Sequence, residues 1–72
     1  MTARLPFTYR RIGAATYEIV SDGAVAGTVW RTRTGWSGAT ASGRQVVDDY
    51  PGSRGVAAAN VIQYNQRETE GN

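Results

Sequence analysis

The chain has 72 residues with no cysteine and no histidine, and eight arginines and no lysine oppose six acidic residues, for a net charge of +2. This composition excludes a disulfide framework and a thiolate zinc site, and the length allows one small domain. No apolar run approaches the roughly 20 residues of a membrane span, and residues 1–13 lack the apolar core of a signal peptide, so we expect a cytoplasmic protein.

The N-terminal segment divides at Pro6. Residues 1–6 have no periodicity, and we expect a flexible arm there. Phe7, Tyr9 and Arg11 alternate with Thr8, Arg10 and Ile12, which permits a short additional strand. We expect a single α+β domain over residues 7–67 and a polar tail over residues 68–72.

Residues 16–41 organise the rest of the chain, because β-forming residues are interrupted there by two turn signals. Asp22-Gly23 is a strong hairpin signal, since both turn positions need positive φ. Thr34-Gly35 is the second signal. These residues therefore predict a meander of three antiparallel strands joined by two tight turns.

Two-residue turns would give this meander two distinct faces. We expect the helix to cover the face with the smaller side chains: Tyr17, Ile19, Ala26, Thr28, Trp30, Thr32, Ala39 and Ala41. The face left open would then carry Glu18, Val20, Val25, Gly27, Val29, Arg31, Arg33, Trp36, Gly38 and Thr40. A slip of one residue in either turn would invert part of this assignment.

The last third of the chain predicts one helix. Residues 45–50 suggest a brief edge strand or an ordered loop, and Pro51-Gly52 closes it. Ser53 is a good N-cap for a helix over residues 54–67, whose apolar stripe consists of Ala57, Ala58, Val61 and Ile62, with Tyr64 as a further candidate. The predicted fold is α+β, with a three-stranded meander, a possible fourth N-terminal strand, and a C-terminal helix on one face.

The residues needed for most catalytic sites are absent. Without histidine, cysteine or lysine, only carboxylates remain, and Asp48-Asp49 is best interpreted as a solvated loop. The glycines match no phosphate-binding pattern. We therefore expect no catalytic activity, no metal, no cofactor and no small-molecule substrate.

An arginine and tryptophan cluster is the strongest functional signal. Arg31 and Arg33 share a face of one strand, and Trp36 follows on the next strand. Guanidinium groups bind phosphate or guanine, and an indole stacks on a base or sugar. The cluster predicts DNA contacts, although a solvated strand with a cation–π pair would show the same pattern.

Other arginines extend this prediction. We expect Arg10, Arg11 and Arg44 to contact phosphates, although basic termini often serve only solubility. Arg54, at the first helical turn, is ambiguous: free N–H groups there attract anions, and Arg54 adds a cation beside them.

Three valines predict an alternative function. On the open face, Val20, Val25 and Val29 would form an exposed apolar patch, which usually marks a protein interface. The alternative is therefore a protein-interaction module, either a homodimer or a small phage protein that binds and modulates a host protein.

Two segments resemble known DNA-binding domains. Gly27-Thr28-Val29-Trp30-Arg31, followed by Gly35-Trp36, resembles the basic hairpin of plant AP2-type domains and of the arm-type N-terminal domains of tyrosine integrases. Residues 50–57 are similar to the helix entry of the integrase domains. The resemblance implies a three-stranded sheet whose open face enters the major groove through Arg31, Arg33 and Trp36.

The arginine-only basic residues favour a GC-rich genome, such as that of an actinobacterium or one of its phages. With no recombinase domain after residue 72, the resemblance implies a small phage or mobile-element accessory or regulatory protein.

Overall fold

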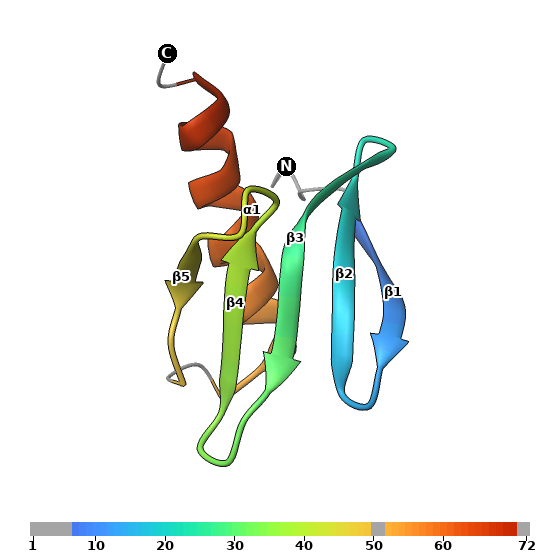
Figure 1. Ribbon diagram of the computed structural model, residues 1–72, viewed down its shortest axis with the longest axis vertical. Helices are drawn as coiled ribbons and strands as arrows, with labels where there is room; N and C mark the ends of the chain where they lie inside the picture. Colours follow the sequence, from blue (N-terminus) through green and yellow to red (C-terminus); the bar gives the residue numbers. More distant parts are fainter. Residues whose placement is uncertain (1–6, 50–51, 71–72) are drawn as a thin grey trace, which may run out of the picture.

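The computed structural model describes residues 7–49 and 52–70, so the predicted N-terminal arm and residues 71–72 lie outside the described part. One antiparallel sheet has five strands in chain order, β1-β2-β3-β4-β5, and one helix follows them (Figure 1). The elements are β1 Phe7–Gly13, β2 Thr16–Ser21, β3 Ala24–Arg31, β4 Trp36–Thr40, β5 Gln45–Val47 and α1 Arg54–Glu70. The α+β class is confirmed, with more strands than the three or four predicted.

Both additional strands lie at the edges of the sheet. β1 pairs with β2 across the Ala14-Ala15 turn, so the alternation over residues 7–12 did indicate a strand. β5 pairs with the end of β4, and Asp48 and Asp49 follow it as exposed residues. The meander is therefore the centre of a wider sheet.

The two turns of the meander differ. Asp22 and Gly23 have φ of 54° and 76°, as a two-residue hairpin turn with both φ positive requires. The second connection is longer than predicted: Arg31 pairs with Trp36, and residues 32–35 form the loop. The Thr32 N–H donates to the Gly35 carbonyl at 2.8 Å, and the Gly35 N–H donates to Thr32 Oγ1 at 3.1 Å.

A β-bulge in β3 overturns the predicted faces. The first pairs after the Asp22-Gly23 turn are as predicted, but Ile19 then pairs with Gly27 and leaves Ala26 as an extra residue. Because side chains alternate, this single insertion turns the rest of β3, and β4 with it, to the opposite side. The helix-covered face keeps Tyr17, Ile19 and Ala26, loses Thr28, Trp30 and Ala39, and gains Gly27, Val29, Trp36, Gly38 and Thr40.

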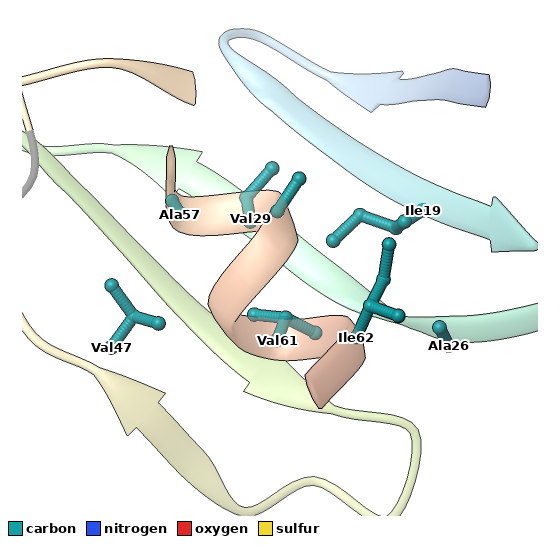
Figure 2. Packing of buried hydrophobic residues seen from close by; sticks show 8 residues of the cluster. Ile19, Ala26, Val29, Val47, Ala57, Val61 and Ile62 are labelled. Carbon is teal, nitrogen blue, oxygen red and sulfur yellow. The ribbon is translucent and has the colours of Figure 1, made fainter. Parts of the chain in front are cut away.

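The core lies between this face and α1, which packs on β3, β4, β5 and part of β2. Figure 2 shows the side chains that meet there. The buried apolar residues are Ile19, Ala26, Val29, Val47, Ala57, Ala58, Val61 and Ile62. The predicted apolar stripe of the helix is confirmed at Ala57, Ala58, Val61 and Ile62, whereas Tyr64 is 37% exposed.

Two glycines allow the helix to approach the sheet closely. A Cβ atom on Gly27 would collide with the Ala39 carbonyl oxygen and with Val61 Cγ1, and one on Gly38 would lie 2.6 Å from Val61 Cγ2. Val61 therefore packs directly on the backbone of β3 and β4, which a side chain at either position would prevent.

Side chains fix both ends of the helix. The Val56 N–H donates to Ser53 Oγ at 3.1 Å, which confirms the predicted N-cap. At the other end, Glu68 accepts hydrogen bonds from Thr40 Oγ1 at 3.1 Å and from Ser42 Oγ at 2.8 Å. These bonds explain why α1 continues through Glu70, beyond the predicted end at residue 67.

Among the described residues, no helix combines the length and the apolar character needed to cross a membrane.

Replacing Gly27 with alanine should lower the free energy of unfolding by about 2 to 3 kcal/mol, because the new methyl group has a backbone oxygen on one side and Val61 on the other. Urea denaturation followed by tryptophan fluorescence measures the change. Gly52→Ala is the matched control, since nothing lies within 4 Å of a Cβ there. Equal stability of the two variants would contradict the close packing of α1.

Candidate nucleic-acid interface

A row of aromatic rings crosses the helix-facing side of the sheet from β1 to β4. The ring centroids of Phe7 and Tyr9 are 5.5 Å apart, those of Tyr9 and Tyr17 are 5.9 Å apart, and those of Tyr17 and Trp36 are 6.2 Å apart. All four side chains are half-buried. The backbone of α1 packs on β3, β4 and β5 and not on β1 (Figure 1). The rings on β1 therefore lie beyond the area that the body of the helix covers, and Arg54 reaches Tyr9 through its side chain.

Arg54 joins the start of the helix to this row. Its Cζ atom lies 4.0 Å from the centroid of the Tyr9 ring and 4.7 Å from that of Tyr17. A guanidinium group over an aromatic face is attracted by the ring and still presents N–H donors at its edges. No acidic residue lies in the first turn of α1, so Arg54 and the free N–H groups there combine as a positive region.

The strand register brings two more arginines to the same place. Arg11 is directly opposite Tyr17, and Arg31 is directly opposite Trp36. Residues opposite each other in an antiparallel pair share a face, so both arginines start from the helix-facing side. Both are exposed, and Arg11 Nε donates to the Gly13 carbonyl at 3.2 Å.

Arg33 lies on the adjoining loop rather than on a strand. Thr34 Oγ1 donates to the Asp49 carbonyl at 3.3 Å, which ties this loop to the segment before α1. Within residues 7–49 and 52–70, the guanidinium groups of Arg31 and Arg33 have no hydrogen-bond or ion-pair partner. Asp48 and Asp49 lie at the same end of the sheet but follow β5, at the edge opposite β1, where they limit the positive region.

We call this region the basic–aromatic surface. It consists of Arg11, Arg31, Arg33, Arg54, Tyr9, Tyr17 and Trp36. The first three arginines and Trp36 were predicted DNA contacts. Neither tyrosine was among the predicted site residues. Each one alternates with polar residues along its strand, Tyr9 in β1 and Tyr17 in β2, and this pattern could have indicated that the two rings share a face of the sheet.

Arg10 and Arg44 do not belong to this surface. Arg10 lies on the other face of the sheet, where its Nη2 pairs with Glu18 Oε1. Arg44 lies at the opposite end of β4, with its Nη1 atom 3.6 Å from Glu68 Oε2. Each has an acidic partner within the chain, so their predicted role as phosphate contacts has less support than that of Arg31 and Arg33.

The expectation that Arg31 and Trp36 point away from the helix is wrong. The bulge at Ala26 turns both to the helix-facing side, where Trp36 packs beside Tyr17. Trp36 is half-buried at the rim of the helix contact, and Arg31 and Arg33 remain exposed. The cluster is therefore accessible, but from a different direction than predicted.

The predicted valine patch is incomplete for the same reason. Val29 is 0% exposed beneath the helix, so its expected place on an open face is wrong. Val20 is half-buried and Val25 is 39% exposed; the two are paired, on the side of the sheet opposite α1. We call that side the uncovered face.

Comparison with known proteins gave no match to a family model, to a curated protein or to a solved structure. The resemblance to AP2-type and integrase arm-type domains remains a prediction.

Replacing Arg54 with methionine should lower the free energy of unfolding by about 1 kcal/mol, because the cation over the two tyrosines is removed while the aliphatic stem is largely kept. Urea denaturation of both proteins gives the difference. Arg67→Met is the control: its Cζ atom is 5.6 Å from the ring of the exposed Tyr64, and its removal should cost less than about 0.5 kcal/mol. If the control loses as much stability, the stacked geometry of Arg54 is not what stabilises the row.

Proposed function

We propose that the protein binds DNA without catalysis and that it does so through the basic–aromatic surface. The observation that carries this proposal is that four of the eight arginines gather at one end of the sheet beside aromatic rings. Two of them, Arg31 and Arg33, are exposed, and their guanidinium groups have no partner within the described residues. Such groups are available to phosphate oxygens.

The chemistry of each group supports a division of roles. Arg31 is the last residue of β3, and Arg33 lies in the loop that follows it. Both would bind phosphates or guanine edges. Arg11 and Arg54 flank the tyrosines and would bind phosphates of the DNA backbone. Such contacts fix the orientation of the protein on the duplex and do not read its base sequence. The positive end of α1 favours an anion at the same place.

A modest net charge of +2 is compatible with this function because charge distribution matters more than its total. Glu18 and Glu68 are paired with Arg10 and Arg44, away from the basic–aromatic surface. The local field at that surface is therefore more positive than the net charge suggests. In this proposal the protein is a cytoplasmic accessory or regulatory protein of a phage or mobile element.

The triple substitution Arg11→Gln, Arg31→Gln and Arg33→Gln should weaken binding to a fluorescently labelled DNA duplex about tenfold or more at low salt. It should also reduce the slope of log K against log salt by about 0.9 for each phosphate that the variant no longer neutralises. Fluorescence anisotropy over a salt series measures both quantities.

The matched control removes the same charge elsewhere, through Arg10→Gln, Arg44→Gln and Arg67→Gln. It should keep most of the affinity and of the salt slope. Equal weakening in both triple variants would show only a general charge effect, and absence of binding by the wild-type protein at low salt would refute the function.

The uncovered face supports the alternative function, a protein-interaction module. Val25 is exposed there, Trp30 is half-buried, and no element of the described chain packs over them. A complex made by this apolar area would respond little to salt, unlike a DNA complex.

Val25→Asp should break such a complex, because it places a charge in the apolar contact area. Sedimentation velocity, or pull-down with a candidate host protein, detects the dissociation. Val56→Asp, at an exposed valine of α1, is the control and should leave the complex intact. If Val25→Asp changes neither assembly nor partner binding, this alternative fails.

A further inference from the structure

The outer edge of β1 is the longest unpaired strand edge in the described chain. β1 has seven residues and β5, at the other edge, has three. The body of the helix packs on β3, β4 and β5, and α1 reaches β1 through the Arg54 side chain over the Tyr9 ring, which leaves the outer edge of β1 uncovered within the described chain. An edge strand exposes a row of N–H and C=O groups that another strand can bind.

The hairpin geometry identifies which peptide groups lie on this edge. In a two-residue hairpin the residues flanking the turn form a hydrogen-bonded pair, so Ser21 directs its peptide groups toward β3. By alternation, Val20 and Glu18 direct theirs toward β1. Their partners in β1 are Thr8 and Arg10, so the peptide groups of Phe7, Tyr9 and Arg11 point outward.

The side chains of β1 favour one register of self-pairing. In an antiparallel pair with its two-fold axis at Tyr9, Tyr9 faces Tyr9 of the second copy, Phe7 faces Arg11 and Thr8 faces Arg10. No like charges are then directly opposite. A two-fold axis at Arg10 would instead oppose two Arg10 side chains in a non-hydrogen-bonded pair, where side chains are closest, and this is unfavourable.

We propose that the protein forms a homodimer by antiparallel pairing of β1 with β1 of a second copy, with the two-fold axis at Tyr9. The dimer has one continuous sheet of ten strands, twice the five of one chain, with both helices on the same side. Phe7 of the second copy lies opposite Arg11, where its ring meets the guanidinium group. Each copy thereby extends the basic–aromatic surface of the other, although the dimer does not depend on DNA binding.

The absence of cysteine from the chain allows a direct test of this register. Opposite residues in a hydrogen-bonded antiparallel pair have Cα atoms about 5.5 Å apart, within the range of a disulfide. Tyr9→Cys should therefore form a disulfide-linked dimer under mild oxidation, as seen by non-reducing gel electrophoresis. Arg10→Cys is the matched control and should remain largely monomeric.

Cross-linking of Arg10→Cys but not of Tyr9→Cys would overturn the register, and cross-linking of neither would overturn the dimer. Sedimentation equilibrium of the unmodified protein gives an independent measurement. Its mass should rise from one chain to two with concentration, and a mass of one chain at all concentrations would refute the proposal.

A second pair of variants separates the backbone from the ring. Tyr9→Pro removes an outward N–H while leaving the β1–β2 ladder intact, and Tyr9→Ala removes only the side chain. The proline variant should dimerise at least tenfold more weakly than the alanine variant. Equal dimerisation of the two variants would exclude pairing through this edge.

Discussion

The contact of Val61 with the bare backbone of Gly27 and Gly38 is the constraint on which this structure depends. Gly27 of β3 and Gly38 of β4 lie on the same face of adjacent strands, with one residue pair between them in the register, and one helical side chain occupies the space that their side chains would fill. The core has few large residues, and three of its eight buried apolar residues are alanines. With so little side-chain volume to fill the space between helix and sheet, the two must lie close together to remain in contact. Dispersion attraction between them falls off steeply when their surfaces separate.

The β-bulge at Ala26 makes this contact possible. Without the extra residue, Gly27 would pair with Glu18 and face away from the helix, while Thr28 and Trp30 would face it. Trp30 is far too large for the space that Val61 leaves above the backbone. The bulge thus places glycine, valine and glycine beneath α1 and turns the bulky indole to the uncovered face. It also turns Arg31 and Trp36 toward the aromatic row, so the packing of the core and the composition of the candidate site have one cause.

Local signals could be read from the sequence, and signals that depend on tertiary contacts could not. The Asp22-Gly23 turn and the Ser53 cap were predicted correctly because the chemistry of each lies within a few residues. Thr34-Gly35 does not form the predicted two-residue turn. The Gly35 N–H donates a hydrogen bond to the Thr32 hydroxyl, which favours a longer loop in which Gly35 does not take a positive φ. The bulge has no local signature except Gly27 inside a strand, a pattern that indicates either a bulge or a close backbone approach. Here it accompanies both.

The partial cover that α1 gives the sheet explains where a binding surface can form. A helix of 17 residues spans about 25 Å of length but only about 10 Å of width, roughly two strand spacings. A five-stranded sheet is wider than that, so the helix-facing side of β1 and β2 must be closed by its own side chains. Phe7, Tyr9 and Tyr17 do this, and Arg54 lies over two of their rings. Amphipathic groups suit such a boundary because their bodies exclude water and their polar ends remain in it. The same requirement that completes the hydrophobic layer therefore leaves guanidinium and aromatic groups together at the surface.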